Sequence, residues 1–148
     1  MQDVANTSAA ATNRDPLAVP LSGVQLIEAS AGTGKTYTLA TLFTRLVVEQ
    51  GLRIGQVLAV TFTDAATQEL RKRIRQRLAL AATQVTRCPE PDDSPEILLT
   101  RQILSEHMTR SGELPQALER RLRLAAEETD LAAVFTIHGF CARVLSEY

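Results

Sequence analysis

The segment that most constrains the fold is ASAGTGKT at residues 29–36, which follows the apolar run VQLIEA at residues 24–29. A strand, a glycine-rich turn and a helix that begins at a lysine form the context of a phosphate-binding loop, whose pattern is G-x-x-x-x-G-K-[ST]. Ala29 replaces the first glycine, whereas Gly32 and Gly34 remain where a side chain would block a phosphate. The segment therefore predicts that backbone N–H groups surround the phosphates of a nucleotide.

The side chains at the end of this loop suit a bound triphosphate and its metal ion. Lys35 is expected to reach the β- and γ-phosphates, and the Thr36 hydroxyl to complete the ligand shell of Mg²⁺. We therefore predict catalytic roles for Lys35 and Thr36. The predicted nucleotide-binding residues of the loop are Ala29, Ser30, Ala31, Gly32, Thr33, Gly34, Lys35 and Thr36.

Hydrophobic periodicity predicts alternating strands and helices. Expected strands cover residues 24–29, 56–62 and 131–136, and expected helices cover residues 35–50, 63–86, 96–109, 114–128 and 138–147. This order favours an α/β layered fold with a parallel sheet. Three strands make a small sheet with two unpaired edges, so we expect the domain to be incomplete. Small polar residues predict a disordered tail over residues 1–15.

Composition and charge limit the classes of ligand, metal site and cellular location that we expect. The formal net charge of −1 over 148 residues gives no global basic field, although a basic segment at residues 71–77 precedes an acidic one at residues 90–96. Two distant cysteines and two histidines provide no metal-ligand set. Neither a secretory signal nor an apolar run long enough for a membrane span is evident, so we expect a cytoplasmic protein without a membrane partner.

Two further segments sharpen the functional prediction. They are VLAVTFTDAATQELRKRI at residues 57–74 and VFTIHGFCARVL at residues 134–145. With LIEASAGTGKTYTLA at residues 26–40, they resemble motifs I, Ia and Ic of the UvrD/Rep branch of superfamily 1 DNA helicases. Within that branch, residues 16–148 are most similar to RecB-type subunits of helicase–nuclease complexes (exodeoxyribonuclease V).

The resemblance implies a fold, a reaction and partners. It implies a P-loop NTPase (RecA-like) three-layer fold, in which residues 16–148 are the N-terminal part of the ATP-binding domain and residues 87–130 a helical insertion. The implied activity is that of an ATP-dependent DNA helicase and translocase in double-strand break repair by recombination. The implied cofactors are ATP and Mg²⁺, and the implied partners are single-stranded DNA, duplex DNA ends and RecC- and RecD-like subunits.

The resemblance also indicates where DNA and the base of the nucleotide are bound. Thr61, Phe62, Thr63, Thr136 and His138 lie at the ends of expected parallel strands, where ligands bind in open α/β sheets, and we expect all five to contact DNA. The alternative is that Phe62 belongs to the core and Thr63 only caps the next helix.

Two more residues are predicted to contact the nucleotide. Tyr37 could stack on the adenine or, equally well, pack on the sheet. Arg73 lies beside the expected apolar stripe Ala66, Leu70, Ile74, Leu78 and Ala82, and the resemblance places an arginine there near the nucleotide. The neighbouring Arg71, Lys72 and Arg75 are expected to form a solvated face.

The sequence departs from a complete enzyme in its acidic residues. No D-E-x-x segment follows an apolar strand, and Glu127, Glu128 and Asp130 follow a run with helical rather than strand periodicity. We therefore expect these 148 residues, as a fragment of a helicase, to bind nucleotide at best weakly and without useful hydrolysis. The alternative is an accessory protein that binds nucleotide or DNA without hydrolysis. A small-molecule kinase would leave the two further segments unexplained.

Overall fold

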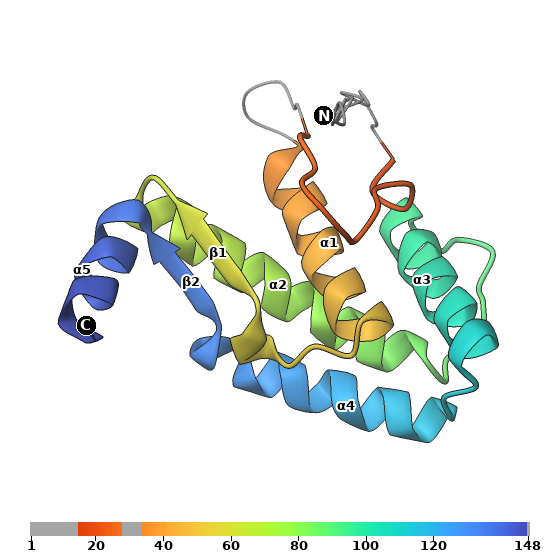
Figure 1. Ribbon diagram of the computed structural model, residues 1–148. Helices are drawn as coiled ribbons and strands as arrows, with labels where there is room; N and C mark the ends of the chain where they lie inside the picture. The colour runs from red at the N-terminus through yellow and green to blue at the C-terminus, as the bar shows by residue number, and fades with distance from the viewer. Residues whose placement is uncertain (1–14, 28–33, 148) are drawn as a thin grey trace, which may run out of the picture.

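The structure, a computed structural model, describes residues 15–27 and 34–147. In chain order its elements are α1 (Lys35–Glu49), the 3₁₀ turn η1 (Ile54–Gln56), β1 (Leu58–Thr61), α2 (Asp64–Gln84), α3 (Pro95–Ser111), α4 (Pro115–Glu127), the 3₁₀ turn η2 (Glu128–Leu131), β2 (Ala133–Thr136) and α5 (Ile137–Glu147). Figure 1 shows α2 running through the middle of the molecule, with α1, α3 and α4 around it and with the strands and α5 towards one end.

The sheet of the described residues consists of β1 and β2, which pair in parallel with Leu58 opposite Ala133 and Thr61 opposite Thr136. The connection between the two strands contains α2, α3 and α4. Both strands are shorter than expected. Leu58 and Val60 are exposed on one face of β1, so the strand is not covered on both faces as its apolar sequence predicted.

The expected strand at residues 24–29 is not formed in the part that the structure describes. Residues 24–27 carry no strand, and residues 28 and 29 lie outside the described ranges. Val24 is 99% exposed and Leu26 is 64% exposed, so these apolar side chains have no partner surface here. A strand requires a neighbour for its backbone hydrogen bonds, and hydrophobicity alone does not supply one.

The helices follow the predicted pattern closely, and local signals determine where they begin and end. Thr63 begins α2, because its hydroxyl accepts a hydrogen bond from the N–H of Ala66 at 3.1 Å. Gly51 adopts φ 65° just after α1, and Gly112 adopts φ 71° at the end of α3. Glycine reaches this left-handed region without strain, which stops both helices.

The hydrophobic core lies between the four longer helices and β2. Fully buried side chains come from α1 (Val48), α2 (Ile74, Leu78), α3 (Ile103, Leu104) and α4 (Leu118, Leu122). The predicted stripe of α2 is confirmed at Leu70, Ile74, Leu78 and Ala82, but Ala66 is exposed. Ala66 belongs to the first turn of α2.

Two arginines, Arg45 and Arg71, form hydrogen bonds with backbone carbonyls of segments that are distant in sequence. Arg45 of α1 is buried and donates to the carbonyl oxygens of Pro16 at 2.9 Å and Val19 at 2.7 Å, which attaches the lead-in segment to α1. Arg71 of α2 is half-buried and donates to the carbonyl oxygen of Val134 in β2 at 3.0 Å. The expectation that Arg71 lies on a solvated face was therefore wrong, because β2 packs beside that part of α2.

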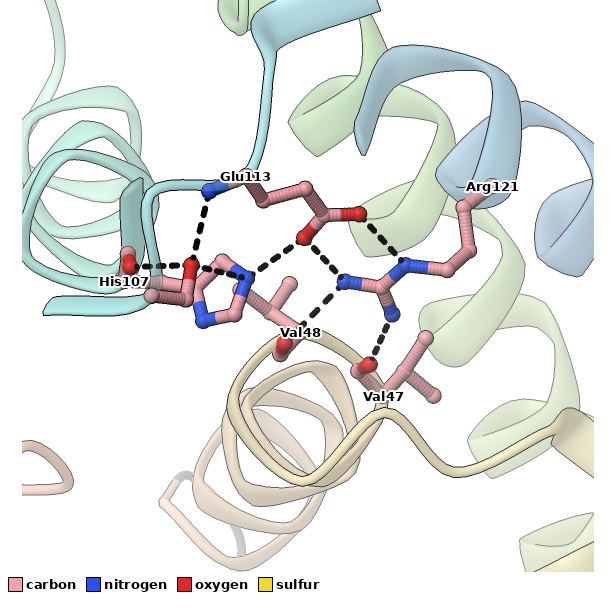
Figure 2. A network of polar contacts seen from close by, with 6 residues as sticks. Val47, Val48, His107, Glu113 and Arg121 are labelled. Carbon is pink, nitrogen blue, oxygen red and sulfur yellow. Dashed lines mark hydrogen bonds and ion pairs between the residues drawn. The ribbon is translucent and has the colours of Figure 1, made fainter. Parts of the chain in front are cut away.

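A polar network connects the C-terminal end of α1 to the segment between α3 and α4 (Figure 2). Arg121 donates to both carboxylate oxygens of Glu113 and to the carbonyl oxygens of Val47 and Val48. Glu113 also lies 2.6 Å from Nε2 of His107. The hydrogen bond from Arg121 is the main cause that holds the pKa of Glu113 below its ordinary value.

The sequence predicted a disordered tail at residues 1–15 and no membrane span. Asp15, which accepts a hydrogen bond from the N–H of Leu17, is the part of the expected tail at residues 1–15 that falls inside the described ranges. Within residues 15–27 and 34–147, no helix is long and apolar enough to cross a bilayer.

Candidate functional site

A cavity of about 500 Å³ lies where the N-terminal end of α1 meets α2 and α3. Its lining residues are Gly34, Lys35, Thr36, Tyr37, Ala40, Glu69, Arg73, Arg77 and Glu96. The structure thus brings together five predicted nucleotide-binding residues, Gly34, Lys35, Thr36, Tyr37 and Arg73. The other predicted residues of the loop, Ala29, Ser30, Ala31, Gly32 and Thr33, lie outside the described ranges.

The N-terminal end of α1 offers hydrogen-bond donors to this cavity. Gly34 precedes the helix and supplies no capping side chain, and its carbonyl accepts the N–H of Thr38 at 2.9 Å. The N–H groups of the first turn have no partners within a helix, and the helix dipole makes this end favourable for an anion. Lys35, the first residue of α1, is exposed and lines the cavity. The arrangement suits a phosphate group.

The charged residues of the cavity come from three helices. Lys35 belongs to α1, Glu69, Arg73 and Arg77 to α2, and Glu96 to α3. Glu69 and Arg73 are one helical turn apart and form an ion pair at 3.0 Å. The cavity is therefore lined by three basic and two acidic side chains. The small excess of positive charge favours an anionic ligand.

Arg77 is the residue of this site that sequence reasoning missed. Its side chain is 3% exposed, and its Nη2 donates to Thr41 Oγ1 at 2.7 Å. Its partner Glu96 belongs to the helix that was expected at residues 96–109, within the expected insertion. The sequence contains one weak signal that Arg77 belongs to the site: it lies one turn after Arg73, on the same face of α2.

The acidic residues considered from the sequence do not line this cavity. Glu128 forms an ion pair with Arg53 at 3.7 Å, and Asp130 forms one with Arg75. Glu127 and Asp130 border a different hollow, between α2 and α4. Among the described residues, the carboxylates of the cavity are those of Glu69 and Glu96.

The predicted DNA-contact residues gather at one edge of the sheet. Thr61 and Thr136 end their strands directly opposite each other in the register. Phe62 follows β1 with 86% of its surface exposed, and His138 is exposed in the first turn of α5. An exposed aromatic ring and an imidazole at the carboxyl ends of parallel strands suit contacts with a base or a phosphate.

The hydroxyl groups at this edge already have partners in the chain. Thr61 Oγ1 lies 2.6 Å from Thr67 Oγ1, and Thr63 accepts the hydrogen bond that begins α2. Thr136 Oγ1 accepts the N–H of Gly139 at 3.0 Å. A Cβ at Gly139 would lie 3.1 Å from Thr136 Oγ1, so the glycine leaves room for this local contact. Phe62 and His138 are both exposed at this edge.

Comparison with known proteins identifies what the chain resembles. Residues 10–148 match the family model of the UvrD/REP helicase N-terminal domain. The chain is 44% identical over 154 aligned positions to RecBCD enzyme subunit RecB of Escherichia coli K12, covering 99% of this chain and 12% of that protein. It is 40% identical over 143 positions to RecBCD enzyme subunit RecB of Haemophilus influenzae, covering 90% of this chain and 11% of that protein.

Proposed function

The chain belongs to the UvrD/REP helicase N-terminal domain family, and from that premise we propose that it is the ATP-binding N-terminal portion of a RecB-like, ATP-dependent DNA helicase and translocase. Such a protein would act in double-strand break repair by recombination. The observation that carries the proposal is the cavity at the start of α1, where Lys35 and Thr36 meet Arg73 of α2. Its volume of about 500 Å³ is in the range of small-molecule sites.

The residues of the cavity fit a nucleotide by their chemistry. The backbone amides of residues 29–36 and the ammonium group of Lys35 would hold the phosphates, and the Thr36 hydroxyl would bind Mg²⁺. Tyr37 would face the base, and Arg73 would add positive charge. ATP bound with Mg²⁺ supplies the phosphoryl group for hydrolysis, while these side chains bind, orient and neutralise charge.

The proposal extends to the organisation of the domain. Residues 16–148 would form part of a three-layer RecA-like domain, with residues 87–130 as a helical insertion. The parallel pairing of β1 with β2 supports this reading, as does the placement of α3 and α4 between α2 and β2 in the chain. The open face of β1 would be covered by further elements of such a domain.

DNA and protein partners follow from the sheet edge and from the relatives. The residues that would border the path of single-stranded DNA are Thr61, Phe62, Thr63, Thr136 and His138. As a RecB-like DNA helicase, the protein would act in the cytoplasm. The relatives are named as RecB subunits of the RecBCD enzyme, so RecC- and RecD-like subunits are proposed as partners. The chain spans 11–12% of these relatives, so partner contacts would also involve regions that have no counterpart here.

Hydrolysis by these 148 residues is proposed to be slow. Phosphoryl transfer requires a positioned water and charge neutralisation as well as phosphate binding. The carboxylates of the cavity are Glu69, which pairs with Arg73, and Glu96, which lies beside Arg77. Strong ATP hydrolysis by the chain in the presence of single-stranded DNA would contradict this part of the proposal.

Calorimetric titration with ATP and Mg²⁺ tests the binding function. We expect Lys35→Ala to weaken ATP binding at least tenfold, because the ammonium group is lost next to the phosphates. We expect Thr36→Ala to remove the dependence on Mg²⁺. Lys72→Ala is the matched control, since Lys72 is exposed on α2 and does not line the cavity. Equal ATP affinity in the Lys35 variant and the unaltered chain would refute the proposal.

A further inference from the structure

Arg77 makes an unusual set of contacts under the side chain of Tyr37. The carbon at the centre of its guanidinium group lies 5.1 Å from the centre of the Tyr37 ring. Its Nη2 donates to Thr41 Oγ1 at 2.7 Å, and its Nη1 lies 3.0 Å from Glu96 Oε1. The side chain is 3% exposed. A guanidinium group removed from water in this way interacts strongly with the face of an aromatic ring.

Thr41 links Arg77 to the backbone of Tyr37. The Thr41 hydroxyl donates to the carbonyl oxygen of Tyr37 at 2.9 Å, one helical turn earlier, and accepts the hydrogen bond from Arg77. Arg77 therefore contacts both the ring of Tyr37 and the residue that is bonded to the Tyr37 carbonyl. Such connected hydrogen bonds restrict both partners more than separate ones do.

The guanidinium group itself is not presented to a ligand. Its Nε and Nη1 atoms are buried and have no hydrogen-bond partner among the described residues, since Nη1 approaches Glu96 at ion-pair distance without hydrogen-bond geometry. A covered donor can affect a ligand only through the groups that cover it. Tyr37, by contrast, is 39% exposed and lines the cavity beside Lys35 and Thr36.

We propose that Arg77 is a positioning residue, which holds the Tyr37 ring as a platform for the base of the bound nucleotide and is neutralised there by Glu96 of α3. This inference rests on the proposed function, because it concerns the base end of the same nucleotide site. Arg77 gives this site its specificity for a planar base, while Lys35 and the helix end bind the phosphates irrespective of the base. Glu96 makes α3 a part of the base end of the site.

Titration with ATP and with inorganic tripolyphosphate separates the two ends of the site. Arg77→Met keeps an unbranched side chain of similar length but removes the charge and the donors. We expect it to weaken ATP binding on the order of tenfold and tripolyphosphate binding distinctly less, because Lys35 and the helix end still bind the phosphates. Arg77→Lys restores the charge without the planar group, and we expect it to recover only part of the ATP affinity.

A second variant, at Tyr37, tests the same role if replacement of the buried Arg77 disturbs the fold. Tyr37→Leu changes a partly exposed residue, and we expect the same selective loss of ATP affinity, with no further loss when it is combined with Arg77→Met. The near-ultraviolet circular dichroism of tyrosine gives a direct signature, because the chain has two tyrosines and no tryptophan. We expect Arg77→Met to reduce this signal.

The outcomes distinguish the inference from the proposed function. Equal losses of ATP and tripolyphosphate binding in the Arg77 variants would overturn the positioning role, as would no loss of either. The inference would also be overturned if the losses caused by Tyr37→Leu and Arg77→Met were simply additive. If the unaltered chain bound neither ATP nor tripolyphosphate, the proposed nucleotide site itself would be overturned.

Discussion

Arg121 Nη2 lies 2.9 Å from Glu113 Oε2, and the same guanidinium group donates to the carbonyl oxygens of Val47 and Val48 (Figure 2). These carbonyls belong to the last turn of α1, where no further helical N–H is available to them. Glu113 thus orients the arginine that satisfies the end of α1. Because α1 begins at the nucleotide cavity, this network fixes one end of the helix that carries Lys35 at the other.

Stability should decrease in acid through Glu113. Its folded-state pKa is lowered from 4.5, first by the hydrogen bond from Arg121, so its contribution is present above that value and is lost as the pH falls through the lower folded-state pKa. We expect Glu113→Gln to lower the free energy of unfolding by about 1–3 kcal/mol at pH 7. Urea unfolding between pH 7 and pH 3 should then show a weaker pH dependence than in the unaltered chain.

Glu106→Gln is the control for this pH dependence. Glu106 is an exposed carboxylate of α3 whose side chain accepts a hydrogen bond from Gln102. Its replacement should leave the acid-induced loss of stability almost as it is in the unaltered chain, because surface charges contribute little. An unaltered pH dependence in the Glu113 variant would show that its carboxylate is not responsible.

Arg73 and Arg75 offer a matched comparison for nucleotide binding. Both are exposed arginines of α2, but Arg73 lines the cavity whereas Arg75 forms an ion pair with Asp130. We expect Arg73→Ala to weaken ATP binding about fivefold to tenfold, because a charge near the phosphates is lost. Arg75→Ala should have little effect on titration with ATP. Equal ATP affinities in the two variants would rule out a nucleotide contact by Arg73.

Phe62 should contribute to binding of single-stranded DNA without stabilising the fold. It is 86% exposed at the carboxyl end of β1, and stacking on a base is worth about 1–3 kcal/mol. We expect Phe62→Ala to weaken binding of an oligonucleotide, measured by fluorescence anisotropy, and to leave the midpoint of thermal unfolding nearly unchanged. Leu114→Ala, at an exposed apolar residue before α4, is the control and should leave DNA binding intact.

Thr63 has a structural role that can be separated from a DNA contact. Its hydroxyl accepts the N–H of Ala66, so Thr63→Ala should lower the free energy of unfolding by about 0.5–2 kcal/mol. Thr63→Ser retains the hydroxyl and should keep most of the stability. If both variants lost stability equally in urea unfolding, the cap would not be the cause.

The helices were predicted well because their signals are local. Thr63 caps α2, Ser94 caps α3 by accepting the N–H of Ile97, and Gly112 ends α3 in the left-handed region. Such signals involve residues at most four positions apart, so the sequence alone contains them. The family membership was predicted for a similar reason, since its motifs are short continuous segments.

The strands and the buried arginines were predicted less well because they depend on distant partners. Residues 24–27 are mostly apolar but carry no strand, since apolar composition does not specify a neighbouring strand. Arg71 was expected in solvent, yet β2, about sixty positions later, accepts its hydrogen bond. The spacing of charges along α2 says nothing about which elements pack beside it.

The sequence by itself determined the phosphate-loop pattern, the ends of the helices and the family, because each depends on residues close together in the chain. Only the tertiary structure decided that Arg77 lies buried beneath Tyr37 and beside Glu96, three residues from three different helices. A buried charge is tolerated only where neighbouring elements supply a partner. That choice is made by the packing of α1, α2 and α3, and it builds the base end of the proposed nucleotide site.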